Sequence, residues 1–119
     1  MFNEEQRFEK PIRWGMVGGG RGSQIGSIHR ASAIRDGLFK LVAGAFDINS
    51  DRGKEFGTNL GIDPNRCYVD YREMLEEESK REDGIQAVSI TTPNKFHYEM
   101  AKAALLSGLH IICEKPLCF

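Results

Sequence analysis

The sequence has no long apolar run and no surplus of charge of either sign. Its 119 residues carry 16 Lys and Arg against 17 Asp and Glu, a formal net charge of −1. A near-neutral chain without a basic stretch lacks the electrostatic signature of a nucleic-acid-binding protein. No apolar stretch approaches the roughly 18 residues that a membrane-spanning helix needs. We therefore expect neither nucleic acid nor a membrane as partner.

Cysteine is scarce, and the amino terminus does not have the pattern of a secretory signal. The three cysteines, Cys67, Cys113 and Cys118, form no C-x-x-C pair, so neither a metal site nor a disulfide framework is indicated. The first residues, MFNEEQRFEKP, are polar and acidic, whereas a signal peptide begins basic and continues apolar. These features are typical of a cytoplasmic protein with reduced thiols.

Length and composition fit one ordinary globular domain. The chain is 40% hydrophobic and 28% charged, which is usual for a folded soluble domain, and its length suffices for a single core. No internal repeat or low-complexity segment interrupts it. We expect residues 1–10 to form a flexible arm and residues 11–119 to form the domain.

Short apolar runs alternate with segments of helical periodicity. Strands are predicted at 12–17, 41–46, 67–69, 85–90 and 109–113, and helices at 25–35, 51–60, 71–82 and 94–107. Asn94 is the expected amino-terminal cap of the last helix, and Gly108 its stop. Alternating strands and helices imply parallel pairing with right-handed crossovers. The sequence thus predicts an α/β fold, a doubly wound parallel sheet of about five strands.

The helix predicted at 71–82 carries a cluster of acidic residues. Met74 and Leu75 lie on its apolar face, and its remaining residues read EEESKRED. Opposite charges four residues apart, such as Glu76 and Lys80, stabilise an exposed helix. We interpret this stretch as a solvated face, with an acidic docking site for a partner as the alternative.

Four unusual clusters follow four of the predicted strands. Gly18–Gly22 follows the first strand, Asp47 the second, Thr91–Asn94 the fourth and Glu114–Pro116 the fifth. In doubly wound sheets, ligands bind outside the carboxyl ends of the strands, where the strand order reverses. The four clusters are therefore expected at one edge of the sheet, and they predict a ligand site there.

The glycine cluster and Asp47 suit a dinucleotide. Glycines allow the positive φ of a sharp turn and a close approach of pyrophosphate to the backbone, and the following helix terminus attracts its charge. Asp47 lies 21 residues after Gly26, near the separation of about 20 expected for a ribose-binding carboxylate. Such a carboxylate repels a 2′-phosphate, so NAD is favoured over NADP, although Arg52 weakens this preference. The alternatives are a plain tight turn and a helix-capping Asp.

Lys115 is the candidate catalytic residue. An ammonium group at a strand end beside a nicotinamide can hydrogen-bond a substrate hydroxyl and take part in proton transfer; the alternative is an exposed lysine before a turn. Pro116 makes a cis peptide available. His97, just after the Thr-Pro-Asn turn, is a candidate for the cofactor edge, whereas packing or surface roles are expected for His29 and His110.

These segments resemble the Gfo/Idh/MocA oxidoreductases. The matching segments are GMVGGG, IGSIHR, AFDINSDRG, YVDYREML and GIQAVSITTPNKFHYEMAKAALLSGLHIICEKPL, and the resemblance covers almost all of residues 12–117. The resemblance implies an NAD(P)-dependent dehydrogenase that transfers a hydride between a nicotinamide and a secondary hydroxyl of a sugar, cyclitol or related polyol. It also implies that the sequence is the N-terminal part of a homo-oligomeric enzyme whose second α/β domain binds substrate, and that by itself it has little turnover.

The same resemblance implies a set of site residues. Lys115 would be catalytic, and the cofactor-binding residues would be Gly18, Gly20, Arg21, Gly22, Ser23, Gly26, Asp47, Thr92, Pro93, Asn94, His97, Glu114 and Lys115. The family pattern is G-x-G-x-x-G, but Ser23 stands three residues after Gly20 and Gly26 stands six after it. Either of the two can take the place of the third glycine.

Two other functions are compatible with the sequence. One is a non-catalytic dinucleotide-binding sensor, which would need no Lys115. The other is a small Rossmann domain that binds no nucleotide, in which the glycine cluster is only a turn.

Overall fold

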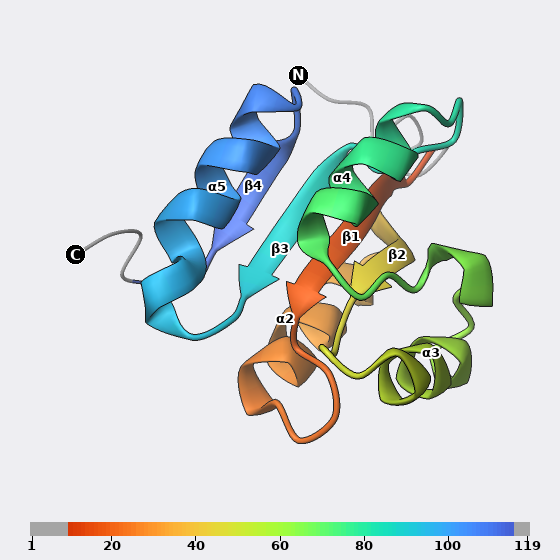
Figure 1. Ribbon diagram of the computed structural model, residues 1–119. Coiled ribbons are helices and arrows are strands. Elements are labelled where there is room, and N and C mark those ends of the chain that lie inside the picture. The colour runs from red at the N-terminus through yellow and green to blue at the C-terminus, as the bar shows by residue number, and fades with distance from the viewer. Residues whose placement is uncertain (1–9, 116–119) are drawn as a thin grey trace.

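Figure 1 shows a sheet with helices on both of its faces. The computed structural model describes residues 10–115. Residues 1–9 of the predicted arm at 1–10, and residues 116–119, lie outside this part. The strands are β1 (Ile12–Gly18), β2 (Phe39–Ala45), β3 (Ala87–Thr91) and β4 (His110–Cys113). They pair in parallel in the order β2-β1-β3-β4. The predicted doubly wound α/β fold is confirmed.

Each face of the sheet is covered by its own pair of helices. The helices are α2 (Gln24–Ile34), α3 (Ser50–Asn59), α4 (Tyr71–Ser79) and α5 (His97–Leu106). Val17 of β1 packs with residues of α4 and α5, whereas Trp14 and Met16 pack with residues of α2 and α3. Alternate residues of a strand point to opposite faces, so β1 contributes to both cores. Within residues 10–115, no helix has the length and apolar character needed to cross a membrane.

The prediction of a strand at 67–69 is wrong. A single bridge pairs Cys67 with Gly44 of β2, and the N–H of Tyr68 donates to the Gly44 carbonyl at 2.7 Å. The 3-10 turn Pro64–Arg66 ends just before this bridge, and Asp70 caps α4 just after it. The segment is too short to continue the ladder, and the described sheet therefore has four strands.

The last helix begins later than predicted. Residues Asn94–Phe96 form a 3-10 turn, in which the Phe96 N–H donates to the Pro93 carbonyl at 3.1 Å. Phe96 is the residue that precedes α5, and it makes no side-chain cap. Asn94 thus belongs to this 3-10 turn and is not the amino-terminal cap of α5, because the turn lies between Asn94 and the helix.

Helix α2 approaches the sheet through small residues. Its buried residue is Gly26, and Ala33 packs against the core on that face. The apolar side chains at helical spacing do not face the core, since Ile28 is 57% exposed and Ile34 is 55% exposed. The backbone of α2 therefore lies close to the loop that follows β1.

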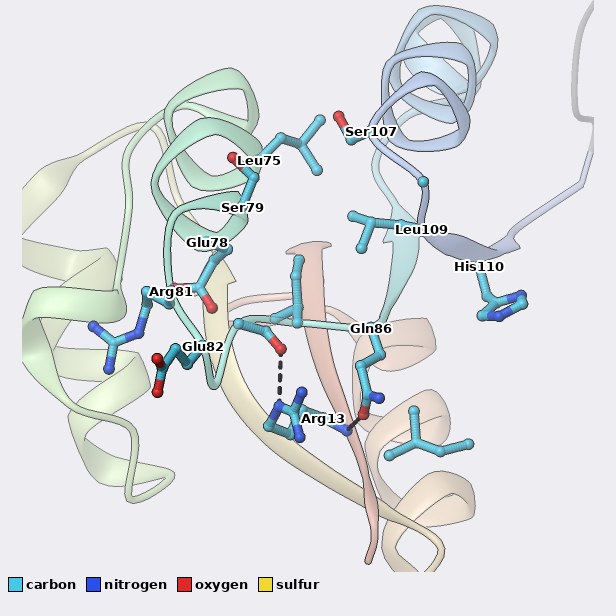
Figure 2. Close-up of a pocket in the computed structure, with 14 residues that line it drawn as sticks. Arg13, Leu75, Glu78, Ser79, Arg81, Glu82, Gln86, Ser107, Leu109 and His110 are labelled. Carbon is cyan, nitrogen blue, oxygen red and sulfur yellow. Dashed lines mark hydrogen bonds between the residues drawn. The ribbon is translucent and has the colours of Figure 1, made fainter.

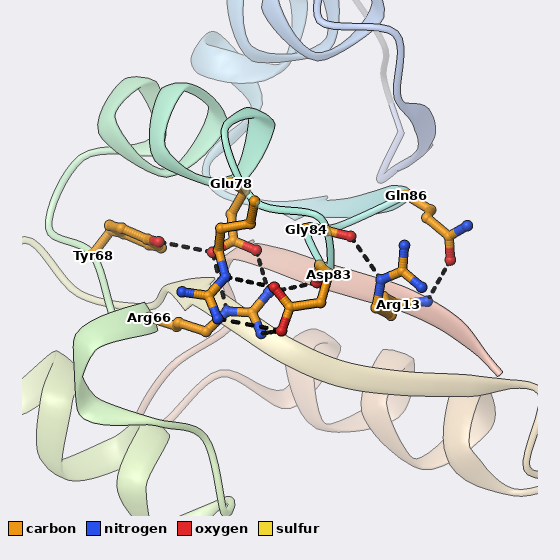
Figure 3. A network of polar contacts seen from close by, with 8 residues as sticks. Arg13, Arg66, Tyr68, Glu78, Asp83, Gly84 and Gln86 are labelled. Atoms are coloured by element: carbon orange, nitrogen blue, oxygen red, sulfur yellow. Dashed lines mark hydrogen bonds and ion pairs between the residues drawn. The ribbon is translucent and has the colours of Figure 1, made fainter. Parts of the chain in front are cut away.

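One carboxylate of the acidic helix α4 is buried. This corrects the interpretation of EEESKRED as a solvated face. Glu78 is 2% exposed and accepts hydrogen bonds from Arg66 Nε at 3.1 Å and from the Tyr68 hydroxyl at 2.7 Å (Figure 3). Arg66, itself buried, also donates from Nη2 to Glu78 and to the Asp83 carbonyl. Burial and the neighbouring carboxylate raise the pKa of Tyr68. Only the outer side of α4 is solvated, where Lys80 pairs with Glu76 at 3.6 Å.

Candidate functional site

A cleft of about 620 Å³ opens at the carboxyl ends of β1, β2 and β3. It is lined by Val17–Gly19, Ser23, Ala45–Ile48, Val69–Tyr71, Thr91–Pro93 and Met100. The chain leaves β1 for β2 on one side, and β3 pairs on the other side of β1. The cleft thus lies at the point where the strand order reverses, which is the place that ligands occupy in such sheets.

The turn after β1 presents bare backbone to this cleft. Gly18 and Gly19 have φ values of 75° and 72°, which residues with a side chain adopt only with strain. A Cβ atom on Gly20 would lie 2.6 Å from the Phe46 carbonyl oxygen. The turn can therefore exist in this form only with glycine at these positions.

Ser23 and Gly26 are the two candidates for the place of the third glycine, and each has a distinct structural role. Ser23 caps α2, because its Oγ accepts a hydrogen bond from the Gly26 N–H at 3.1 Å, and it lines the cleft. Gly26 packs on the glycine turn: a Cβ atom there would overlap the backbone of Gly19 and lie 2.8 Å from its carbonyl carbon. Gly26 is thus the glycine that lets helix and turn touch.

We predict that Gly26→Ala destabilises the chain by about 1–3 kcal/mol, because the added methyl group must push α2 away from Gly19. Gly53→Ala is the matched control. Gly53 also lies within a helix, but a Cβ atom there would meet its nearest neighbour, the Asp47 carbonyl oxygen, at 3.6 Å. Alanine should stabilise that helix by about 0.5–1 kcal/mol. Urea unfolding measures both changes, and similar effects of the two substitutions would contradict the prediction.

Asp47 lies in the cleft at the end of β2. Its Oδ1 accepts hydrogen bonds from the Asn49 N–H at 2.9 Å and from Arg52 Nη2 at 3.2 Å. The hydrogen bond from Asn49 and the Arg52 guanidinium lower the pKa of Asp47, so the carboxylate is ionised at neutral pH. The cap of α3 is Asn49, whose side chain accepts from the Arg52 N–H at 3.0 Å. Asp47 is therefore not needed as a helix cap.

The loop after β3 borders the cleft with Thr92 and Pro93. The Thr91 hydroxyl donates to the Val17 carbonyl at 3.0 Å, which holds this loop against the end of β1. His97 is fully buried, and its Nε2 lies 2.6 Å from the Thr92 carbonyl oxygen. His97 thus supports the loop from behind and does not line the cleft. The side chain of Asn94 lies outside the described part of the structure.

The remaining predicted site residues lie around the cleft rather than in its lining. Arg21 borders a shallow hollow with Arg52, and Gly22 borders another beside the first turn of α2. Glu114 follows β4 and contacts His29 of α2 at 2.8 Å between Oε1 and Nε2. Lys115 is exposed and ends the described region, so Pro116 and its peptide bond lie outside it. The cleft therefore brings together five of the predicted residues, Gly18, Ser23, Asp47, Thr92 and Pro93.

Sequence reasoning missed part of the lining. Ile48, Val69 and Tyr71 add apolar surface beside Asp47. Val69 and Tyr71 follow the bridge at Cys67. Ligands bind at the carboxyl ends of strands in such sheets. Applied to the strand predicted at 67–69, this rule identifies Val69 and Tyr71 as candidates.

A second cavity, of about 540 Å³, lies at the opposite edge, around the amino ends of β1, β3 and β4 (Figure 2). Arg13 spans this edge: its Nε donates to the Gly84 carbonyl at 2.9 Å, and its N–H donates to Gln86 Oε1 at 3.0 Å. None of the residues predicted as a site lines this cavity. Among the described residues, no three His, Cys, Asp or Glu side chains gather in a way that could hold a metal ion.

Known proteins are similar to this chain in both fold and sequence. The inositol dehydrogenase homolog from Azotobacter vinelandii, solved with NAD+ and also with NADH and myo-inositol, is 62% identical, with a TM-score of 0.93. The NAD+ complex matches 100% of this chain and 31% of that chain. An oxidoreductase from Pseudomonas syringae is 64% identical over 93% of this chain and 30% of its own, with a TM-score of 0.92.

The curated relatives give the same result. The oxidoreductase YfiI of Bacillus subtilis (strain 168) is 60% identical over 120 aligned residues, which are 100% of this chain and 30% of that protein. The chain thus spans less than a third of the length of these relatives. Residues 12–119 match the model of an oxidoreductase family with an NAD-binding Rossmann fold. This chain belongs to that family, the Gfo/Idh/MocA oxidoreductases.

Proposed function

We propose that this chain is the cofactor domain of an NAD(H)-dependent dehydrogenase acting on a secondary hydroxyl of a cyclitol, sugar or related polyol. The observation that carries the proposal is the cleft at the reversal of strand order, where a bare glycine turn faces an ionised Asp47. The relative solved with NADH and myo-inositol supports both the cofactor and the substrate class.

The residues around the cleft suit a dinucleotide. The glycine turn and the amino terminus of α2, capped by Ser23, offer backbone N–H groups to a pyrophosphate. Asp47 accepts hydrogen bonds from the adenosine ribose hydroxyls, and the apolar side chains of Ile48, Val69 and Tyr71 lie where a flat ring can pack. Thr92 and Pro93 border the other end.

The chemistry belongs to the end of the site near the loop after β4. When bound, the nicotinamide supplies or accepts the hydride. Lys115 holds its ammonium toward the substrate hydroxyl, donates a hydrogen bond to that oxygen and takes part in moving its proton. Substrate contacts beyond Lys115 come from the longer protein.

The function is tested by titrating NADH and NADPH into this chain. We expect NADH fluorescence to rise and saturate, and the melting temperature to increase with NADH concentration, because a ligand that binds only the folded state stabilises it. NADPH is expected to bind more weakly. The absence of binding by either nucleotide would overturn the proposal.

We predict that Asp47→Asn weakens NADH binding about tenfold, because a neutral amide accepts ribose hydrogen bonds less strongly than a carboxylate. The same change should strengthen NADPH binding, since it removes the charge that repels a 2′-phosphate and leaves Arg52, now 3.2 Å from Asp47, without its ion pair. Asp51→Asn, at an exposed position in the first turn of α3, is the control. An unchanged ratio of the two dissociation constants in Asp47→Asn would contradict the role of Asp47.

A further inference from the structure

Two adjacent residues of α2 reach opposite ends of the proposed site. Arg30 donates from Nη1 to the carbonyl oxygen of Gly19 in the glycine turn. His29 lies 2.8 Å from Glu114, between Nε2 and Oε1. One helix is therefore connected to the loop after β1 and to the loop after β4, although 85 residues separate His29 from Glu114.

Glu114 connects this helix to the backbone of Lys115. The Glu114 N–H donates to the Ile90 carbonyl at 3.0 Å, which extends the pairing of β4 with β3 by one residue. The Glu114 carboxylate accepts a hydrogen bond from His29, and this bond lowers the pKa of Glu114. The carboxylate is therefore ionised at neutral pH, and Lys115 is the next residue along the backbone.

The contact is better shielded from water than the surface ion pairs of this chain. The His29 side chain is 14% exposed and that of Glu114 is 30% exposed, against 61% for Lys80 and 49% for Glu77 in the pair on α4. Shielding makes a carboxylate contact more persistent than a solvated pair, which contributes little. The contact is therefore suited to holding a loop in place.

We propose that His29 is a positioning residue, which acts through the Glu114 carboxylate to place Lys115 at the nicotinamide end of the site. The inference rests on the proposed function, because Lys115 takes its role from it. His29 is not among the residues that line the cleft. Its loss should therefore affect the end of the site near Lys115 and spare the end near Asp47.

The test compares NADH with ADP-ribose, which keeps the adenosine and the pyrophosphate but lacks the nicotinamide. His29→Leu removes the donor and is expected to weaken NADH binding about tenfold while changing ADP-ribose binding less than about twofold. His29→Gln retains a side-chain N–H donor and should restore NADH affinity to within about threefold of the original. His110→Leu, at the exposed start of β4, is the matched control and should change neither affinity.

The two ligands distinguish a positioning role of His29 from a purely structural one. Equal weakening of both ligands by His29→Leu would indicate a general loss of structure and would overturn the proposal, as would unchanged NADH affinity. If the unsubstituted chain binds neither ligand, the proposed function fails, and the contact is then judged from the Lys115 amide resonance in NMR spectra. A resonance that moves in His29→Leu and returns in His29→Gln supports the connection, and an unmoved resonance overturns it.

Discussion

Lys115→Met, introduced into the longer dehydrogenase that we propose contains this chain, is expected to lower kcat by about 10²–10⁴-fold, the usual contribution of a positioned acid or base. Methionine keeps the length and apolar stem of the side chain but can neither donate a hydrogen bond nor carry a proton. NADH affinity should fall by no more than about tenfold, the loss expected for His29→Leu, because the ribose and pyrophosphate contacts are elsewhere. Steady-state oxidation of myo-inositol and an NADH titration measure the two quantities.

The control for this substitution is Lys102→Met on the exposed side of α5, for which we expect no change in kcat. A kcat of Lys115→Met equal to that of the unsubstituted enzyme would remove Lys115 from the mechanism. A parallel loss of NADH affinity would instead make Lys115 a cofactor-binding residue.

Glu78→Ala is expected to destabilise this chain by about 3–5 kcal/mol, because it removes the buried counter-charge of Arg66 and leaves only the exposed Asp83 carboxylate, 3.7 Å away, beside the buried guanidinium. Arg66 is 7% exposed and Glu78 2% exposed, so water cannot replace the lost contact without rearrangement. The Tyr68 hydroxyl, 2.7 Å from Glu78 Oε2, loses its acceptor as well. Urea unfolding of the chain measures the change.

Glu77→Ala provides the comparison on the same helix. Glu77 pairs with Lys80 at 3.4 Å on the exposed side, and its loss should cost less than about 0.5 kcal/mol. Glu78→Gln, which keeps acceptors for Tyr68 and Arg66 but not the charge, should fall between the two. If Glu78→Ala costs no more than Glu77→Ala, the buried network does not stabilise the fold in the way its geometry indicates.

Local pattern predicted best the segments in which the apolar periodicity and the flanking turn residues indicate the same boundaries. The run that ends in Gly18 is a strand, and the runs that end near Asp47 and Thr92 are strands as well, each displaced by no more than two residues at its ends. Parallel strands joined by right-handed crossovers have their carboxyl ends at one edge. For that reason the sequence was sufficient to place these clusters at one edge of the sheet.

The buried polar contacts escaped prediction because each joins segments far apart along the chain. Glu78 lies in a run of charged residues, where periodicity indicates solvent, and its partner Arg66 is 12 residues away beyond a turn. His29 lies on a helix whose apolar spacing did not reveal that it reaches Glu114, 85 residues later. A local pattern carries no information about such a partner.

Local pattern and chain chirality determine the order of strands and helices along the chain, the handedness of their connections and the edge at which the polar clusters gather. None of these depends on contacts between distant residues. Which polar side chains are buried together, and which glycine touches which backbone, was decided only when α2 and α4 packed on the sheet. Gly26 meets Gly19 and Glu78 meets Arg66 because this packing brings their segments within contact distance.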